Sequence, residues 1–464
     1  MSAAQRLAAE LAAKDRPLRI LGASGQLGYG IPSESFEAGL ARRPDLIGCD
    51  MGSIDIGPYC LGSGEMGTAP ASTIRDLRRV LKGARSLDVP LVIGTAGAAG
   101  AAPHLEATLA MVRQIAREEG LHFRLASIRA DMNRDDLKAA LAAGKVRGFD
   151  GSPKLADEEI DAAGNIVGQM GSTSFIRAFE QGADVIIAGR ACDTAIFASL
   201  PIMLGFPAGL AVHMAKIIEC ASLCCVPGGR DPLLATLDRE GFELESMAPQ
   251  RAATPMSVAA HALYEQADPF VVNEPEGELD LRGAQYTAID ARRTRVTGAV
   301  WHAAAKPSVK IEGARLIGHR AVLLAGVSDP RFMAAHETIF AEVKQVVRNL
   351  ISEGVEPDYD LFFRLYGYDG VLPPSATPIP PPREAFVLGE CIAPTPQRAA
   401  EVVRSTKQYL LHHGYPGRLS TGGNLAFPFA PPEVSVGPAY RFNVYHLVEV
   451  DNLDELFPVT MEEI

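Results

Sequence analysis

The chain lacks the features that mark membrane, secreted and nucleic-acid-binding proteins. It has no run of about 18 consecutive apolar residues, so no transmembrane helix is expected. The alanine-rich segment at residues 2–16 lacks the apolar core of a signal peptide. The 44 lysines and arginines form no basic block and are outnumbered by 56 acidic residues, which gives a net charge of −12. We therefore expect neither nucleic acid nor a membrane surface as a partner.

Cysteine is scarce and irregularly spaced. Seven cysteines cannot all pair in disulfides, and this odd count predicts the reducing environment of the cytoplasm. Cys220, Cys224 and Cys225 lie close together in the sequence, but the paired C-x-x-C spacing that is typical of zinc sites is absent. We predict that these three residues are small apolar members of a core rather than metal ligands.

Motifs of several enzyme classes are missing as well. No tyrosine is followed four residues later by a lysine, the pair that short-chain dehydrogenases use for proton transfer. His261 does not stand in an H-E-x-x-H sequence, and Ser24 does not stand in a G-x-S-x-G sequence. Zinc-protease and α/β-hydrolase chemistry are therefore not supported.

In the first part of the 464-residue chain, short apolar segments alternate with amphipathic helical patterns. Strands are predicted at 17–22, 45–49, 91–93, 124–128 and 183–188, and helices at 33–41, 73–84, 104–119, 133–144 and 175–181. This alternation predicts an α/β fold with a mainly parallel sheet that helices cover on both faces. The α/β domain is expected to comprise residues 1–268. An apolar stretch at 195–204 suggests either a homo-oligomer contact or a core helix.

The pattern changes after Asp268, and residues 269–464 are expected to form an α+β C-terminal region. The predicted elements are strands at 285–289, 295–300, 309–311, 320–324, 361–366, 385–391 and 441–450, and helices at 334–350 and 396–412. The proline-rich segment at 373–382 is predicted as a surface loop rather than a domain boundary.

Two glycine-rich turns follow predicted strands, at 20–28 and 92–100, and an acidic turn lies between them at 45–55. Gly22, Gly25 and Gly28 have the G-x-x-G-x-x-G spacing of a dinucleotide-binding turn. Because the tyrosine–lysine pair is missing, we prefer the alternative that these glycines let a strand turn sharply. The carboxyl ends of parallel strands form a binding edge, so the turns predict where the chemistry takes place.

The turns supply candidate catalytic and metal-binding residues. Asp50 and Asp55 are predicted to bind a divalent metal ion or to act in acid–base chemistry, the alternative being a solvated loop. His104 opens a helix, and the positive end of the helix dipole favours the neutral imidazole that a general base requires. Arg190 is predicted to bind a substrate carboxylate and Asp193 to orient it, unless the two form a structural ion pair.

Two further pairs complete the predicted site. His213 and Lys216 fall on one face of a helix, where a base and an anion-binding lysine would act together, unless the helix is simply buried. Ser24 and Thr95, which lie in the two glycine-rich turns, are expected to contact the substrate.

Taken together, these motifs resemble those of the acyclic terpene utilisation family. The matching stretches are 22–25, 45–53, 93–97, 183–193, 213–220 and 254–265. The resemblance implies a bacterial cytoplasmic protein in the breakdown of branched terpenoid or other organic acids, beside acyl-CoA carboxylases and CoA transferases. Some members carry or work beside a further small C-terminal domain, so the resemblance also implies a separate small partner protein.

We therefore expect a hydratase/dehydratase or an isomerase that acts on a small branched carboxylate or an acyl-CoA. Such an enzyme needs a base that removes a proton next to a carbonyl, and a cationic group that binds the acid. His104 or His213 would be the base, and the divalent ion would be the cofactor. The alternatives are a non-catalytic subunit or scaffold of an acyl-CoA carboxylase or hydratase complex, and an NAD(P)-dependent oxidoreductase.

Overall fold

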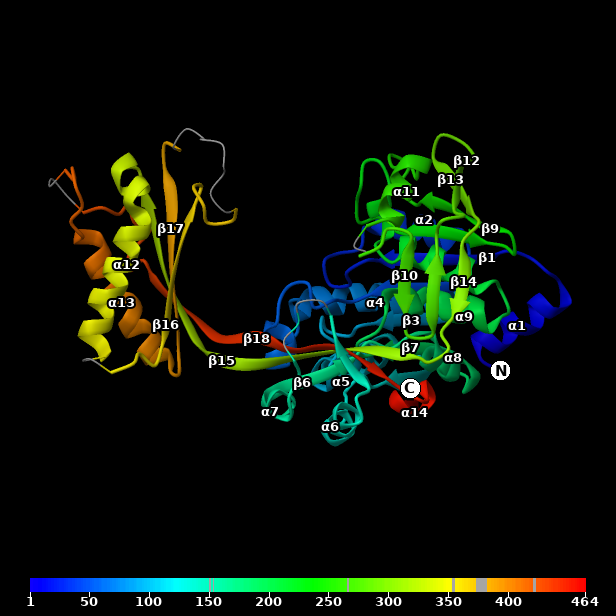
Figure 1. Cartoon of the computed structure of the whole chain (residues 1–464). Coiled ribbons are helices and arrows are strands. Elements are labelled where there is room, and N and C mark those ends of the chain that lie inside the picture. The colour runs from blue at the N-terminus through cyan, green and yellow to red at the C-terminus, as the bar shows by residue number, and fades with distance from the viewer. Residues whose placement is uncertain (150–151, 153, 265–266, 353–354, 373–381, 420–422) are drawn as a thin grey trace. The chain divides into compact units, whose positions relative to one another are not determined.

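The computed structural model of the chain describes all residues except 150–151, 153, 265–266, 353–354, 373–381 and 420–422 (Figure 1). The described residues form two compact units, one of Met1–Arg315 with Phe442–Ile464 and one of Leu316–Arg441. This division differs from the boundary after residue 268 that the sequence pattern suggested. The proline-rich segment at 373–382 lies, except for its last residue, outside the described residues.

A ten-stranded sheet forms the centre of the first unit. Its middle consists of strands that pair in parallel, in the spatial order β1 (Leu18–Ser24), β2 (Leu46–Asp50), β3 (Leu91–Gly94), β7 (Val185–Ala188) and β4 (Arg124–Ile128). Antiparallel strands extend it on both sides: β8 (Leu233–Leu237), β9 (Gly241–Ser246), β13 (Arg293–Thr297) and β12 (Gln285–Ala288) beyond β1, and β19 (Val459–Glu463) beyond β4. The expected α/β class is confirmed, whereas the sheet is mixed rather than mainly parallel.

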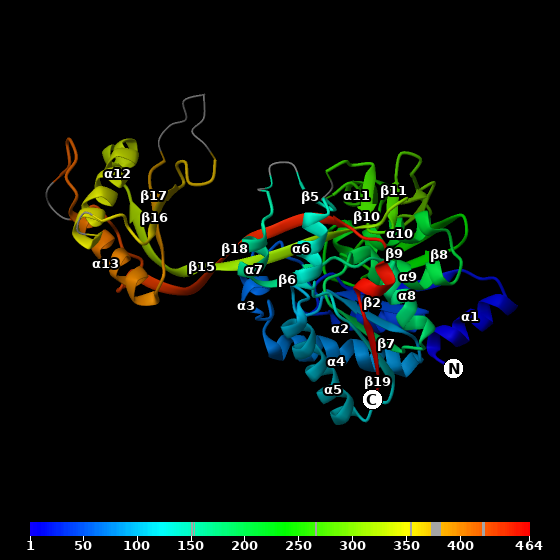
Figure 2. The same cartoon turned by 60° about the horizontal axis from the view of Figure 1, so that its bottom comes forward.

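Helices cover both faces of this sheet because the parallel strands are apolar on both faces. Successive residues of β2 and β7 alternate between two separate cores: Ile47 and Ile187 belong to one, and Leu46 and Ile186 to the other. The first core is covered by α2 (Ser33–Ala41), α4 (Pro70–Leu87) and α5 (Ala102–Glu119), and the second by α1 (Ala3–Ala13), α8 (Ser172–Glu180), α9 (Asp193–Met203) and α10 (Ala208–Ile218) (Figure 2). The apolar stretch at 195–204 lies mostly in α9, which is buried, so it is a core helix.

The first unit contains several smaller elements around this sheet. They are α3 (Tyr59–Ser63), α6 (Arg134–Ala142), β5 (Val146–Gly148), α7 (Asp157–Ala162), β6 (Ala163–Gly168), the 3-10 helix η1 (Ala221–Cys224), α11 (Pro255–Ala262) and α14 (Leu453–Leu456). A three-stranded antiparallel sheet of β10 (Val271–Glu274), β11 (Gly277–Asp280) and β14 (Val300–Ala303) contacts α10. This small sheet brings residues from far along the chain to the helices that follow the parallel strands.

The loops after the parallel strands are joined by backbone hydrogen bonds. The N–H of Met51 donates to Gly94 O at 3.0 Å, the N–H of Thr95 to Gly189 O at 3.0 Å, and the N–H of Arg190 to Gly100 O at 3.1 Å. Gly100 has a φ of +68°, and a Cβ there would lie 2.2 Å from the Arg190 nitrogen. Glycine is therefore required for this close approach, which fixes the positions of the side chains that follow β2, β3 and β7.

The second unit is an antiparallel sheet with two helices. Strands β16 (Asp360–Tyr366), β17 (Ala385–Ala393), β15 (Ser308–Val327) and β18 (Glu433–Glu449) pair in this order, and β15 and β18 begin or end in the first unit. Helices α12 (Pro330–Ser352) and α13 (Pro396–His412) contact each other and this sheet (Figure 1). Their amphipathic patterns place Phe332, Val343 and Val402 in a core of their own. None of the described helices is long and apolar enough to cross a membrane.

Candidate functional site

Charged side chains gather where the parallel strands of the first unit end. Asp50 is the last residue of β2, and Asp193 is the first residue of α9, shortly after β7. Burial raises the pKa of both carboxyl groups, that of Asp193 to about 7, and the neighbouring carboxylate Glu219 raises both further. The two acids also repel each other, and the pKa of Asp50 lies well above its usual range. The structure thus brings two of the predicted site residues together.

Asp193 is at the centre of this cluster. It interacts electrostatically with Glu219, Arg190 and Lys216, and its Oδ1 atom is buried without a hydrogen-bond partner among the residues that the structure describes. Lys216, from α10, donates to Glu219 Oε1 at 2.9 Å. The carboxyl of Asp193 is thus buried among charged groups and keeps one oxygen that no described residue engages.

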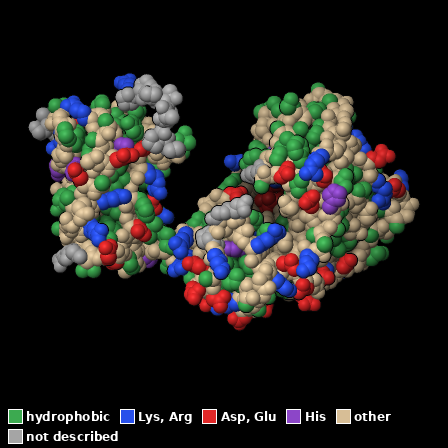
Figure 3. Space-filling view, in the orientation of Figure 1, with side chains coloured by type: hydrophobic (Ala, Val, Ile, Leu, Met, Phe, Trp, Pro, Cys, Tyr) green, Lys and Arg blue, Asp and Glu red, His purple; other side chains and the backbone are tan. Residues whose placement is uncertain are grey.

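A cavity of about 600 Å³ opens next to this cluster and is lined by Glu274, Cys192 and Lys310 among others. Glu274 ends β10 and accepts a hydrogen bond from the Thr194 hydroxyl at 2.7 Å. Burial raises the pKa of Glu274 to about 7, although its hydrogen bonds with Cys192 and Thr194 favour the charged form. Figure 3 shows acidic side chains recessed in a hollow of the first unit. Glu274 can therefore both accept and donate a proton near neutral pH.

Positive charge faces the same cavity. Lys310 lines it, and its ammonium group is 2.8 Å from Glu312 and lies over the ring of Tyr445 at 4.7 Å. Arg147 also lines it, is exposed, and forms no ion pair with any described residue. An organic acid in the cavity would thus meet cationic groups on one side and the carboxyl of Glu274 on the other.

Arg190 does not face this cavity as an open anion-binding group. Its Nε donates to Glu312 Oε2 at 2.8 Å and its Nη2 to Oε1 at 3.3 Å, and both side chains are at most 5 % exposed. Arg190 thus forms a structural ion pair, which was the alternative predicted for it. Its partner is Glu312 rather than the predicted Asp193. Lys310 pairs with the same Glu312 carboxylate. Arg190 therefore orients Glu312, and Glu312 in turn holds Lys310 at the cavity.

His104 connects two backbone segments. Its Nδ1 accepts from the Ala101 N–H at 3.2 Å, and its Nε2–H donates to the carbonyl oxygen of Glu65 at 3.0 Å. The side chain is fully buried, and burial lowers the pKa of the imidazole. With both nitrogens engaged, His104 joins the loop after β3 to the loop after α3, and this arrangement offers no atom for proton transfer.

His213 faces away from the carboxylates. Its Nε2 is 3.2 Å from the Tyr286 hydroxyl, and its ring packs edge-on against Phe242. Burial lowers its pKa to about 3. Lys216, one turn later on the same helix, instead contacts Glu219. The structure therefore separates the two residues that the helical spacing had placed together.

The remaining predicted residues lie in different environments. Thr95 is fully buried, and its hydroxyl donates to Ala191 O at 3.4 Å. Ser24 accepts from the N–H of Gln26 at 3.2 Å and lines a smaller cavity of about 350 Å³. Asp55 is exposed and accepts a hydrogen bond from the Ser53 hydroxyl at 2.7 Å, whereas Asp50 is buried. The two carboxylates, which were predicted to bind one metal ion, therefore lie in different environments.

The first glycine turn is occupied by the chain itself. A Cβ on Gly22 would lie 2.5 Å from Ile218 O, and one on Gly25 would lie 2.8 Å from the Cα of Cys220. The next helix, α2, begins only at Ser33, so no helix N-terminus follows the turn as in a dinucleotide site. Gly22 and Gly25 allow the end of α10 to approach β1, whereas Gly28 has a φ of +105° and lies against Thr68.

Sequence reasoning missed Glu274 as a site residue and treated Cys192 only as part of a strand-end motif. Glu274 precedes Pro275 in a hairpin turn, and that local sequence carries no catalytic pattern. The hairpin belongs to the three-stranded sheet that lies beside α10, and this long-range contact decides its role.

Comparisons with known proteins give one match. A family model described as acyclic terpene utilisation family protein AtuA matches residues 71–230. This confirms the resemblance seen in the sequence motifs, over a segment that includes Arg190, Asp193 and Lys216. No curated protein and no solved structure matches the chain.

Proposed function

We propose that this chain, which matches the acyclic terpene utilisation family over residues 71–230, is an enzyme that moves a proton next to the carbonyl carbon of an organic acid or acyl-CoA. The reaction class is a hydratase/dehydratase or an isomerase, and a branched terpenoid acid is the expected substrate type. The observation that carries the proposal is the carboxyl of Glu274, whose pKa is raised to about 7 where it lines a cavity of about 600 Å³.

Glu274 replaces the histidines as the expected acid–base group. A base whose pKa is near the working pH is present in both forms, so it can remove a proton from one carbon and return it to another. Thr194 donates to one of its oxygens, which fixes the direction of the carboxyl group. A cavity of this size accommodates a small organic acid or the acyl part of a thioester.

The cationic groups have a matching role. Lys310 and Arg147 would bind the substrate carboxylate or the thioester carbonyl oxygen, and so hold the acidic C–H near Glu274. The same positive charges would stabilise the enolate that forms when the proton leaves. Glu312 fixes Lys310 at 2.8 Å, so the lysine is positioned before the substrate arrives.

Hydrogen exchange tests this proposal whichever product the reaction forms. Branched organic acids and their CoA thioesters are incubated with the protein in D₂O, and loss of the α-proton signal is followed by NMR. We expect enzyme-dependent exchange for at least one compound, with a rate that rises with pH through about 7 as Glu274 ionises. Glu274→Gln should reduce this rate by about 10²- to 10⁴-fold.

Asp280→Asn is the matched control, because Asp280 is also an acid of the small sheet but does not line the cavity. It should leave the exchange rate unchanged. Exchange that survives in Glu274→Gln would show that another group is the base. If no compound exchanges while the protein co-purifies with a carboxylase or hydratase subunit, the non-catalytic alternative holds instead.

A further inference from the structure

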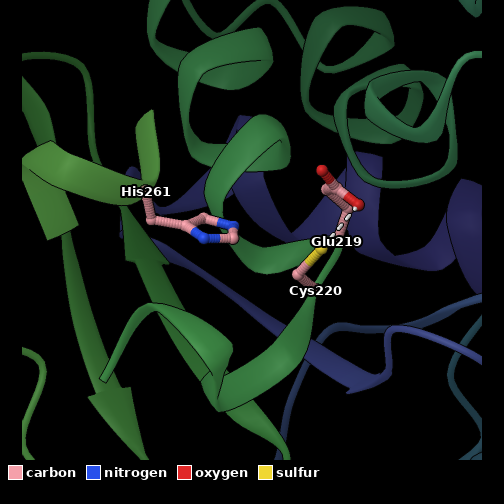
Figure 4. A group of neighbouring side chains, drawn as sticks. All are labelled: Glu219, Cys220 and His261. Carbon is pink, nitrogen blue, oxygen red and sulfur yellow. Dashed lines mark hydrogen bonds between the residues drawn. The ribbon is translucent and has the colours of Figure 1, made fainter. Parts of the chain in front are cut away.

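A second group of side chains in the first unit has the composition of a metal site. Glu219 follows the last residue of α10, Cys220 comes next, and His261 is on α11. One ligand atom of each lies within 4.8 Å of the other two. Figure 4 shows the imidazole of His261 pointing toward Glu219 and Cys220. We propose that Glu219, Cys220 and His261 bind a divalent transition-metal ion, with Zn²⁺ as the expected ion.

The neighbouring residues hold these ligands in place. Lys216 donates to Oε1 of Glu219 at 2.9 Å, which leaves Oε2 on the side of the sulfur, 3.2 Å from Cys220 Sγ. Glu219 is 3 % exposed and His261 8 % exposed. Hydrogen bonds of this kind, from a neighbour to a ligating carboxylate, orient ligands in metal sites.

Three segments that are distant in the sequence converge at this point. The 3-10 helix η1, which Cys220 precedes, contacts both α10 and α11. A capping box between Thr254 and Ser257 starts α11 and so sets the direction in which His261 leaves the helix. Gly25 lies against the Cα of Cys220, so the first glycine turn is part of the wall of this site.

The charge around the group favours a cation. Asp50 and Asp193 both interact electrostatically with Glu219, and within this neighbourhood Lys216 is the positive group that faces them. Arg190 is also near, and it shares the carboxylate of Glu312 with Lys310. A divalent ion would stabilise the carboxyl groups of this neighbourhood in their charged form.

The ligand types select the class of metal. Thiolate and imidazole favour zinc and related transition metals over Mg²⁺ or Ca²⁺, which prefer oxygen ligands. When the metal–sulfur bond forms, the Cys220 thiol releases its proton to solvent and the thiolate coordinates the ion. Three protein ligands leave a fourth position for water or a substrate, as in catalytic zinc sites.

The site has a route to solvent. Cys220 lines the cavity of about 350 Å³ that also contains Ser24 and Arg230. An ion can reach the sulfur through this cavity, and an anionic ligand there would meet Arg230. This gives Ser24, which was predicted to contact the substrate, a position next to the proposed ion.

A second group of potential ligands in the described part of the chain differs in its ligand types. His336, Glu337 and Asp369 also lie close together in the second unit. There, Nδ1 of His336 is 2.7 Å from Met333 O and Nε2 is 2.8 Å from Asp369 Oδ2. Both imidazole nitrogens are thus used within the protein, and the group contains no sulfur ligand.

Metal binding by the full chain tests the proposal independently of catalysis. Chelator-treated protein is loaded with Zn²⁺ for elemental analysis and with Co²⁺ for absorption spectroscopy. We expect about one ion per chain and a thiolate-to-cobalt charge-transfer band. Cys220→Ala should abolish the band, because the variant has no thiolate ligand. It should also weaken Zn²⁺ binding by more than about 100-fold, since loss of a residue that only orients a ligand already costs up to about 100-fold. His261→Gln should weaken binding similarly.

Cys224→Ala is the matched control, because Cys224 is a buried cysteine four residues away and outside the ligand group. It should retain the band and the affinity. Far-UV circular dichroism and the fluorescence of Trp301 establish that each variant folds, and His261→Gln decides the matter if Cys220→Ala does not fold. Metal well below one ion per chain in the wild type, or a band that survives Cys220→Ala, would overturn the proposal. Neither result depends on whether Glu274 catalyses proton transfer.

Discussion

The two units differ in how they treat an acidic residue that is removed from water. In the second unit, Glu390 on β17 accepts hydrogen bonds from Arg320 and Arg364, both at 2.6 Å, and its pKa is lowered. In the first unit, no described arginine donates a hydrogen bond to Asp193 or Glu274, although the charge of Arg190 acts on Asp193, and burial raises the pKa of both acids to about 7. Neutralised acids stabilise a fold, whereas acids kept near neutral pKa serve chemistry. The proposed acid–base group therefore lies in the first unit.

Glu312 sharpens this comparison, because it is a buried acid of the first unit that pairs with cations. Glu312→Gln leaves the buried guanidinium of Arg190 without its partner, and we expect a loss of about 3–5 kcal/mol in the free energy of unfolding. Trp301, the single tryptophan of the chain, lies in the first unit and reports its unfolding in urea. Glu390→Gln, followed by circular dichroism, should cost about 1 kcal/mol or less, because its arginines are 31 % and 41 % exposed. If Glu312→Gln and Glu390→Gln lowered the free energy of unfolding equally, the predicted difference between the two ion pairs would be wrong.

Asp193 in the first unit and Glu390 in the second should contribute to the pH dependence of stability with opposite signs. The pKa of Asp193 rises from 3.8 in the unfolded chain to about 7 in the folded one, so the folded state holds a proton that the unfolded state releases. The first unit therefore loses stability as the pH rises from about 4 to 7, by an amount on the order of 3 kcal/mol. Asp193→Asn should remove the part of this loss that comes from Asp193, and leave the parts that come from Asp50 and Glu274, when metal-free protein is unfolded in urea and followed by Trp301 fluorescence.

Glu390 provides the comparison for this titration. Because its folded pKa is lowered, its contribution to stability is present above pH 4.5 and disappears as the pH falls through the folded pKa. The difference between wild type and Glu390→Gln should therefore shrink in acid, whereas the difference for Asp193→Asn grows from pH 4 to 7. A difference for Asp193→Asn that does not vary with pH would contradict the assignment.

Asp55 should give the smallest effect. Its carboxylate is exposed and contacts only the neighbouring Ser53 hydroxyl among its described hydrogen bonds. Asp55→Asn should change the free energy of unfolding by no more than about 0.5 kcal/mol, and it should leave zinc content and hydrogen exchange at the wild-type level. Loss of zinc in this variant would instead favour a metal site that includes Asp55.

Local sequence patterns predicted much of the fold. The apolar segment at 183–188 contains β7, and the amphipathic patterns at 104–119 and 396–412 correspond to α5 and α13. These elements follow from periodicity, which neighbouring residues determine. The strands β8 and β9 were not predicted, and β12 and β13 were expected in the C-terminal region rather than in this sheet, because pairing between distant strands leaves no mark in a local pattern.

The candidate site was predicted only in part for a related reason. Asp50 and Asp193 follow strands, so the rule that ligands bind at the carboxyl ends of parallel strands located them. The rule could not tell that His104 uses both nitrogens on backbone groups or that Arg190 has Glu312 as its partner. A side chain's chemistry depends on what faces it, and those partners come from elsewhere in the chain.

The sequence by itself determined the alternation of strands and helices, the glycine turns and the position of the binding edge, because each follows from residues near one another. Tertiary structure alone decided that the first glycine turn packs against Cys220, that Glu274 reaches the cavity, and that His261 meets Glu219. The physical reason is that burial and electrostatic repulsion act through space. They raise the pKa of a carboxyl or assemble a ligand set only where the folded chain brings those groups together.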